Sequence, residues 1–182
     1  QEPIYPLAKR LVIYTQEQKV RNTFPINQTE LSTLIKSYQQ LVDELGINSV
    51  TLEALKNMAN LHAFYVDNMQ EAINLLEKAI GAGKSDQGFV DRCKLDLGDI
   101  YVLINEPWEA TLLYSQVEKS QKDNHLGYEA KLRNARLHYF QGNFDLSKQV
   151  LDILKRATTR EIANDANALS LLIMDNTGLD SS

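Results

Sequence analysis

The chain of 182 residues carries a formal net charge of −5, which argues against nucleic acid as its main partner because phosphate binding needs a concentrated basic surface. Its single cysteine, Cys93, excludes an internal disulfide and a metal site built from several cysteines. No apolar run approaches the roughly 20 residues that a membrane-spanning helix needs.

Apolar residues recur at three- and four-residue steps along most of the chain, and this spacing indicates amphipathic helices. The first helix is expected near residues 6–20, where Leu7, Leu11 and Tyr14 fit one apolar stripe. The clearest stripe covers residues 31–45, with Asn27 placed as its N-cap and Gly46 as its end.

Capping residues and turn residues mark the later helices. Their starts are assigned to Asn68, Ser85 or Asp86, Pro107, Asn124, Asn143 and Thr158. The last helix is expected to run to about Met174. About nine helices joined by short turns predict an all-α fold of stacked antiparallel helix pairs.

Three segments of the chain resemble one another. They are NMQEAINLLEKAI (68–80), EPWEATLLYSQV (106–117) and NFDLSKQVLDIL (143–154). Two helices approach closely only where small residues occupy their crossing. Small residues recur at equivalent places in these segments and in the helices before them, with two tyrosines expected to fill the volume around one crossing. The residues assigned to packing between helices are Ala72, Gly98, Tyr101, Ala110, Tyr114, Ala135 and Ser147.

The pattern L-G-x-x-Y at residues 97–101, followed by A-x-x-x-Y-x-x-V at residues 110–117, resembles the tetratricopeptide repeat. The resemblance covers about residues 50–156, as three repeats, and implies a right-handed superhelix. The chain from residue 108 onward also resembles a group of envelope-associated tetratricopeptide proteins of Bacteroidetes. That likeness implies a periplasmic or cell-envelope location, with the cytoplasm as the alternative.

The expected organisation is a single repeat domain over residues 1–182, as a fragment of a longer protein. Its parts are an N-terminal helix pair (1–48), three repeats (49–83, 85–121 and 124–157) and a terminal helix (158–175). Leu169, Leu171, Leu172 and Ile173 make that terminal helix apolar enough to need a neighbour on both sides. Either a continuing chain or dimerisation through this helix would supply that neighbour.

In tetratricopeptide repeats the first helix of each pair lines the concave face, and the resemblance places eleven residues there. They are Asn57, Leu61, Phe64, Arg92, Leu95, Asp99, Val102, Glu129, Leu132, Arg136 and Tyr139. The hypothesis is a mixed groove for a peptide or a subunit, in which aromatic residues anchor the partner and arginines orient it. The alternative for each apolar member is packing between repeats.

Trp108, at the start of its helix, has two interpretations. It covers Leu112 or packs on a neighbouring repeat, or it contacts a partner, because tryptophan is enriched in binding hot spots.

No catalytic or cofactor motif accompanies the repeats. Gly83-Lys84-Ser85 lacks the earlier glycine and the preceding strand of a phosphate loop, so it is assigned to a turn. The three histidines have no metal-ligand spacing, and Asp91, Asp96 and Asp99 are interpreted as a solvated helix face. No cofactor or metal is therefore predicted.

The sequence favours a non-catalytic protein-interaction scaffold. A structural spacer within a larger envelope protein is the first alternative, and an enzyme or small-ligand sensor built on helical hairpins is the second.

Overall fold

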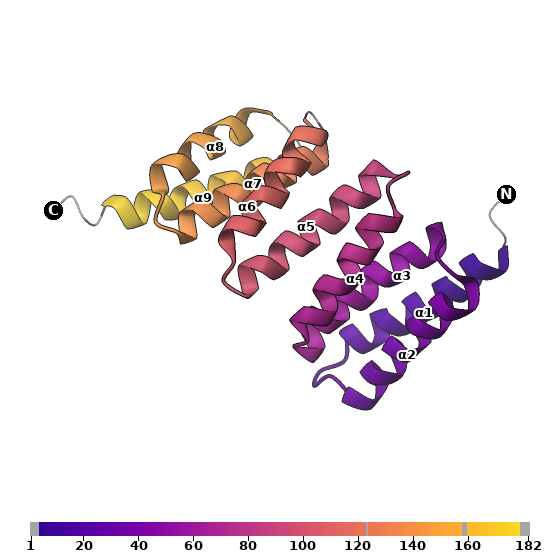
Figure 1. Ribbon diagram of the computed structural model, residues 1–182. Helices are drawn as coiled ribbons and strands as arrows, with labels where there is room; N and C mark the ends of the chain where they lie inside the picture. Colours follow the sequence, from indigo (N-terminus) through magenta and orange to yellow (C-terminus); the bar gives the residue numbers. More distant parts are fainter. Residues whose placement is uncertain (1–3, 123, 158–159, 179–182) are drawn as a thin grey trace. The chain divides into compact units, whose positions relative to one another are not determined.

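A computed structural model describes residues 4–122, 124–157 and 160–178. Within these residues the chain forms nine α-helices and one π-helical segment and no strand (Figure 1), which confirms the all-α fold class. The elements are α1 (Ile4–Arg21), α2 (Gln28–Leu45), α3 (Ser49–Leu61), the π-helical η1 (His62–Val66), α4 (Met69–Ala82), α5 (Gln87–Leu103), α6 (Pro107–Ser120), α7 (His125–Phe140), α8 (Phe144–Ala157) and α9 (Arg160–Gly178).

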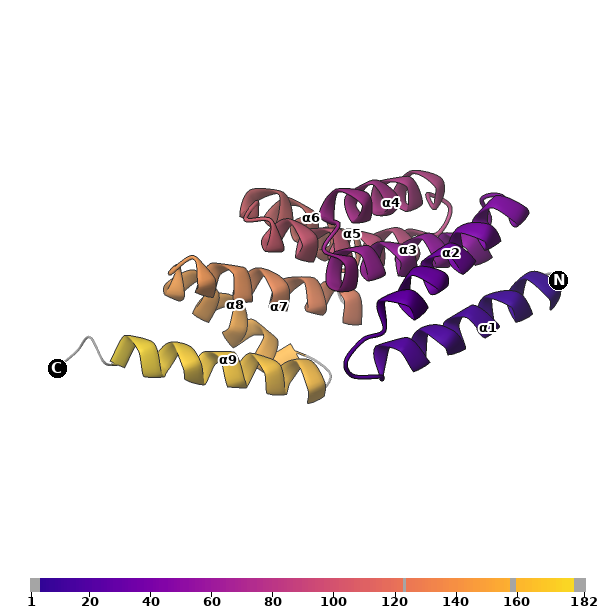
Figure 2. The same cartoon turned by 90° about the horizontal axis from the view of Figure 1, so that it is seen from below.

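The helices fall into two compact units, residues 1–93 and 94–182, and the boundary lies within α5. In the first unit α2 packs on α1 and α3, and α4 packs on α3. In the second unit α7 packs on α6 and α8, and α9 packs on both α7 and α8 (Figures 1 and 2). The contacts between α1 and α3 and between α7 and α9 show that the first helices of successive pairs lie side by side.

The predicted helix starts are confirmed at the level of hydrogen bonds. The side chains of Asn27, Asn68, Asp86 and Asn124 each accept from a backbone N–H in the first turn of the following helix. Pro107 is the first residue of α6, where its missing N–H costs nothing. The predicted cap Thr158 lies outside the described residues.

The buried face of α1 differs from the predicted stripe. Leu11 and Tyr14 are 50% and 46% exposed, whereas Ile13, Glu17 and Val20 are buried. The difference arises from a buried carboxylate on α1 and not from an apolar side chain. Tyr38 on α2 donates a 2.5 Å hydrogen bond to the Glu17 carboxylate, and Arg21 pairs with the same carboxylate at 2.6 Å. The Tyr38–Glu17 bond joins α2 to α1 and favours the rotation of α1 that turns the predicted stripe outward, whereas the Arg21–Glu17 pair lies within α1.

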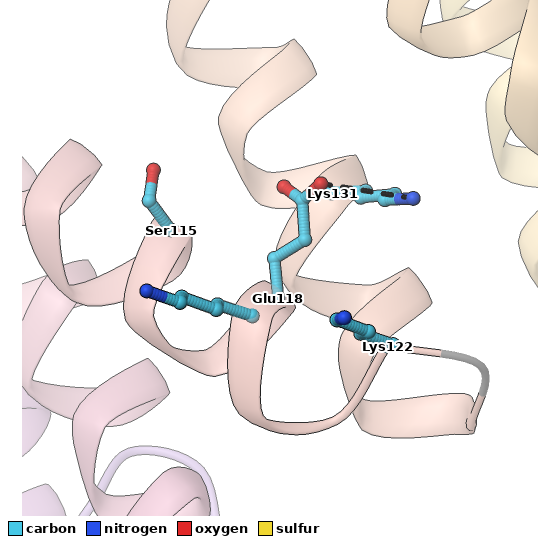
Figure 3. Close-up of a pocket in the computed structure, with 5 residues that line it drawn as sticks. Ser115, Glu118, Lys122 and Lys131 are labelled. Atoms are coloured by element: carbon cyan, nitrogen blue, oxygen red, sulfur yellow. Dashed lines mark ion pairs between the residues drawn. The ribbon is translucent and has the colours of Figure 1, made fainter.

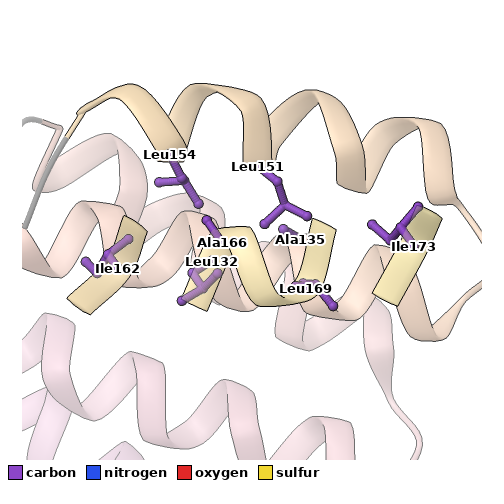
Figure 4. Close-up of a cluster of buried hydrophobic side chains, with 8 residues drawn as sticks. All are labelled: Leu132, Ala135, Leu151, Leu154, Ile162, Ala166, Leu169 and Ile173. Atoms are coloured by element: carbon purple, nitrogen blue, oxygen red, sulfur yellow. The ribbon is translucent and has the colours of Figure 1, made fainter. Parts of the chain in front are cut away.

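The residues assigned to packing lie in the interior of their units. Ala72, Ala110, Ala135 and Ser147 are fully buried, and Tyr101 is half-buried. The Ser147 hydroxyl donates to the Ala135 carbonyl at 2.8 Å, so the two small residues bring the backbones of α7 and α8 together. Ala135 belongs to a cluster of eight buried residues that joins α7, α8 and α9 (Figure 4).

Gly98 accommodates an aromatic ring. A Cβ atom at Gly98 would lie 2.5 Å from Cε1 of Tyr114, closer than real Cβ contacts come. The sequence predicted that Gly98 and Ala110 lie at a close helix crossing with Tyr101 and Tyr114 filling the volume around it. Ala110 is buried as expected, and the group that excludes a side chain at position 98 is the Tyr114 ring.

Substitution of Gly98→Ala is expected to destabilise the protein by about 1–3 kcal/mol, because the Tyr114 ring must move and its hydroxyl is hydrogen-bonded. Gly81→Ala is the matched control, since Gly81 is helical and has no atom within 4 Å of the added Cβ. That control is expected to be neutral or to gain up to about 1 kcal/mol. Urea denaturation measures both, and equal stabilities of the two variants would contradict this account.

Candidate partner-binding surface

Three of the eleven residues predicted for a concave face are buried instead. Leu61, Leu95 and Leu132 are 0%, 2% and 4% exposed. Leu132 packs with residues of α8 and α9, and Leu95 packs with residues of α6 and α7. Their assignment to a partner surface is therefore corrected to packing within the repeats, the alternative that their apolar character left open.

The remaining predicted partner residues of the first unit are Asn57, Arg92 and Phe64. Asn57 donates to the Tyr38 hydroxyl at 3.1 Å and is half-buried. Arg92 pairs with Glu53 at 3.1 Å. Phe64 belongs to η1 and is 53% exposed. Each of the three has a different local environment.

Asp99 and Glu129 take part in a polar network across three helices of the second unit. The Tyr114 hydroxyl donates to Asp99 at 2.7 Å, and Arg133 donates to Asp99 at 2.8 Å and to Glu129 at 2.5 Å. Burial raises the pKa of Asp99 above its ordinary value, and the nearby Arg133 charge partly opposes that rise.

Asp91, also predicted on a solvated face, is fully buried. The predicted solvated face is therefore wrong for Asp91, which accepts from Gln87 at 2.8 Å, whereas the Asp99 side chain is 38% exposed and pairs with Arg133.

Arg136 and Tyr139 are brought together in an open groove between α7 and α9. The groove has a volume of about 430 Å³, and its lining is Arg136, Tyr139, Phe140, Asp165, Ala168, Leu169 and Leu172. Helix α7 is the first member of the α7–α8 pair, and α9 follows that pair. The sequence identified Arg136 and Tyr139 but neither Phe140 of α7 nor the lining residues from α9, because the prediction took only some positions of α7 and carried no concave positions past the third repeat.

The groove has an apolar wall and a charged rim. Phe140 and Leu172 are 77% and 51% exposed, although both are large apolar side chains. On the rim Arg136 donates to Asp165 at 2.8 Å, with about half of each side chain exposed. The Tyr139 ring lies 5.4 Å from the Phe140 ring, and its hydroxyl accepts from Asn176 at 3.0 Å. These contacts hold the aromatic wall in place before any partner arrives.

A second pocket lies between α6 and α7 (Figure 3). Its lining is Ser115, Glu118, Lys119, Lys122 and Lys131, and Glu118 pairs with Lys131 at 3.6 Å. Charges of both signs line this pocket, and it contains none of the predicted partner residues.

Val102 and Trp108 lie outside both pockets and are exposed. Val102 is 37% exposed. Trp108 is 80% exposed and Leu112, one turn along α6, is 54% exposed. The interpretation of Trp108 as a packing residue is therefore not supported, and partner contact is the alternative that the exposure favours.

Residues 4–122, 124–157 and 160–178 contain no group of three or more histidine, cysteine or acidic side chains placed to hold a metal ion. Among the helices that the structure describes, none combines the length and the apolar composition that a membrane crossing requires. Cys93 is fully buried and forms no disulfide.

Several solved structures are similar to this chain. One is a Podosopora anserina putative kinesin light chain with nearly identical TPR-like repeats, at 16% identity and a TM-score of 0.71 over 98% of this chain and 90% of that chain. A single-residue variant of that protein matches at 15% identity with a TM-score of 0.72 over the same shares. A tetratricopeptide repeat protein from Parabacteroides merdae matches at 18% identity with a TM-score of 0.63, over 100% of this chain and 68% of that one.

These similarities establish the fold as a tetratricopeptide-like helical repeat, as the sequence motifs indicated. Neither the family models nor the curated proteins that were compared gave a match.

Replacement of Arg133 by glutamine is expected to cost about 1–2 kcal/mol near neutral pH, because the half-buried Asp99 carboxylate loses its cation. The pKa of Asp99 is higher in the folded protein than its ordinary value, so the contribution of Asp99 to stability is lost as pH rises through the raised pKa. The deficit should therefore shrink as pH falls from about 7 to about 4. Urea denaturation at both pH values measures this difference.

The control is the double variant that combines Arg133→Gln with Asp99→Asn. Asparagine has no charge that would be left without a partner, and its side-chain oxygen still accepts from the Tyr114 hydroxyl. It should recover part of the lost stability and lose the pH dependence. A deficit that is independent of pH in the single variant would show that the Asp99 charge is not the cause.

Proposed function

We propose that this chain is a non-catalytic protein-interaction scaffold that binds a peptide segment or a subunit in the groove between α7 and α9. The observation that carries the proposal is the groove itself, where exposed Phe140 and Leu172 stand beside the Arg136–Asp165 pair. Buried apolar contact would supply most of the affinity, and the ion pair would orient the partner. The tetratricopeptide-like fold supports this class of function, because stacked helix pairs present extended surfaces to partners.

Arg136, on the rim of the groove, has N–H groups that its bond to Asp165 does not use. Arg136 uses Nη2 for Asp165, whereas a guanidinium carries five N–H donors in a planar fork. A backbone carbonyl or a carboxylate of the partner could therefore bind beside Asp165 without breaking the ion pair. The half-buried Tyr139 ring would then contact an apolar side chain of the same partner.

The alternatives have less support. A spacer within a larger envelope protein needs no groove with exposed aromatic and aliphatic walls. An enzyme or a small-ligand sensor needs convergent polar groups in one pocket, whereas the α7–α9 groove combines one ion pair with apolar side chains. Location in the periplasm or cell envelope remains a proposal that rests on the sequence resemblance.

The test compares two neighbouring leucines of α9. Leu172 is 51% exposed and lines the groove, whereas Leu171 is 61% exposed and does not. Peptides are first selected against the wild-type chain by display, and their affinities are then measured by titration calorimetry. Leu172→Asp is expected to weaken binding at least about tenfold, equal to about 1.4 kcal/mol, and Leu171→Asp to leave it unchanged.

Both leucines are exposed, so circular dichroism should show intact helices in both variants. Arg136→Glu and Tyr139→Ala provide further tests of the same groove. Equal binding by the wild type and the folded Leu172→Asp and Tyr139→Ala variants would place the interaction elsewhere, with Trp108 as the next surface to test.

A further inference from the structure

The pocket between α6 and α7 concentrates positive charge on a chain that is negative overall (Figure 3). Three lysines and one glutamate line it, which gives the lining a net charge of +2, against −5 for the whole chain. Glu118 pairs with Lys131 at 3.6 Å, and the Lys131 ammonium also lies 6.0 Å from the centre of the Tyr128 ring. The only carboxylate among the described lining residues is therefore already paired, and two further lysines remain.

Lys119 and Lys122 are the two cations that no described carboxylate offsets. Both are exposed, and neither ammonium group forms an ion pair or a hydrogen bond within the part of the chain that the structure describes. Lys119 lies in the last turn of α6, where the helix dipole favours a cation, but Lys122 lies beyond the end of that helix. Like charges around one pocket repel one another, and an anion placed among them would offset that repulsion.

Ser115 adds an uncharged hydrogen-bond donor to the same pocket. Asn134, which is 7% exposed, donates from Nδ2 to the Ser115 hydroxyl oxygen at 3.4 Å. The hydroxyl oxygen therefore accepts from the protein, and its hydrogen is left for a ligand. Apart from Glu118, which is paired with Lys131, the polar side chains that line the pocket all donate to anions.

We propose that this pocket is a second binding site of the chain and that it binds an acidic peptide segment, whose aspartate or glutamate side chains lie among the lysines. Two carboxylates match the charge of Lys119 and Lys122. The pocket volume of about 520 Å³ lies within the range of about 300–1,000 Å³ that holds ligands of many atoms, so one small anion would fill little of it. A single exposed contact between lysine and carboxylate is weak, whereas a segment that makes several at once gains affinity.

Other polyanions fit the pocket less well. Among the described lining residues none is aromatic, so the pocket offers no ring on which nucleobases stack. Clusters of about four to eight lysines or arginines recognise anionic membranes, more than the three lysines here. Lysine is a point charge without the planar fork of arginine, so it accepts carboxylates of a flexible segment in many geometries.

The experiment uses a rhodamine-labelled peptide of six glutamates as the probe and a labelled peptide of six glutamines as its uncharged control. Fluorescence anisotropy measures binding to the whole chain at low salt, where screening of exposed charges is weak. The wild type is expected to bind hexaglutamate and not hexaglutamine. Its affinity for hexaglutamate is expected to fall as salt is added.

The pocket variant combines Lys119→Gln with Lys122→Gln. Its matched control combines Lys84→Gln with Lys148→Gln, because both of these lysines are exposed, lie outside the pocket and change the net charge equally. The pocket variant is expected to bind hexaglutamate at least about tenfold more weakly, and the control to stay within about twofold of the wild type. All four side chains are exposed, so circular dichroism should show intact helices in both variants.

Equal affinities of the pocket variant and the matched control would overturn the proposal, because the attraction would then come from charge spread over the surface. A wild-type chain that does not bind hexaglutamate up to about 1 mM would also overturn it. Tighter binding of phosphatidylserine vesicles or of a single-stranded oligonucleotide, lost in the same pocket variant, would assign the pocket to another class of partner.

The Leu172→Asp variant separates this proposal from the one for the α7–α9 groove. The groove and the pocket share no lining residue, so Leu172→Asp is expected to bind hexaglutamate as the wild type does. Loss of hexaglutamate binding in folded Leu172→Asp would place the acidic segment in the groove and overturn the assignment to the pocket.

Discussion

A tyrosine hydroxyl that donates to an arginine-paired carboxylate sets the helix rotations in both units. In the first unit Tyr38 donates to Glu17, which also binds Arg21. In the second unit Tyr114 donates to Asp99, which also binds Arg133. Burial, together with interaction with these carboxylates, raises the pKa of both tyrosines, so each stays protonated and remains a donor at neutral pH. A buried carboxylate without such partners would cost several kcal/mol, so each helix has one rotation that satisfies it.

These polar bonds decide which apolar residues become core and which become surface. The Tyr38–Glu17 bond leaves Leu11 and Tyr14 outside and buries Ile13 and Val20. In the second unit the Tyr114 ring covers Gly98 while its hydroxyl reaches Asp99, so ring packing and hydrogen bonding fix the same crossing. Apolar side chains would accept several rotations with similar burial, whereas a hydrogen bond of about 2.7 Å accepts few.

Local signals in the sequence predicted most of the fold. Asn27 and Asn124 cap their helices as expected, because capping depends on residues within one turn. The small residues Ala110 and Ser147 were identified from their repeated spacing, and both are buried. The π-helical η1 had no signal, since its hydrogen bonds depend on how α3 meets α4.

The candidate site was predicted only in part, because a periodic pattern does not show which residues of one helix face are covered by a neighbouring helix. Leu132 and Tyr139 are seven residues apart, close to two full turns of α7, yet Leu132 is 4% exposed and Tyr139 lines the groove. The missing information is the position of α9, which covers one residue and leaves the other beside an opening.

The exposure of an arginine separates a structural role from a binding role in this fold. The Arg133 side chain is 21% exposed and bridges Asp99 and Glu129, so its removal leaves carboxylates without a counter-charge. The Arg136 side chain, three residues further along α7, is 47% exposed and pairs with Asp165, whose side chain is 50% exposed. An exposed pair of this kind contributes about 0–1 kcal/mol to stability. Evolution can therefore change Arg136 to suit a partner with little effect on the fold, whereas Arg133 is constrained by the packing of α5, α6 and α7.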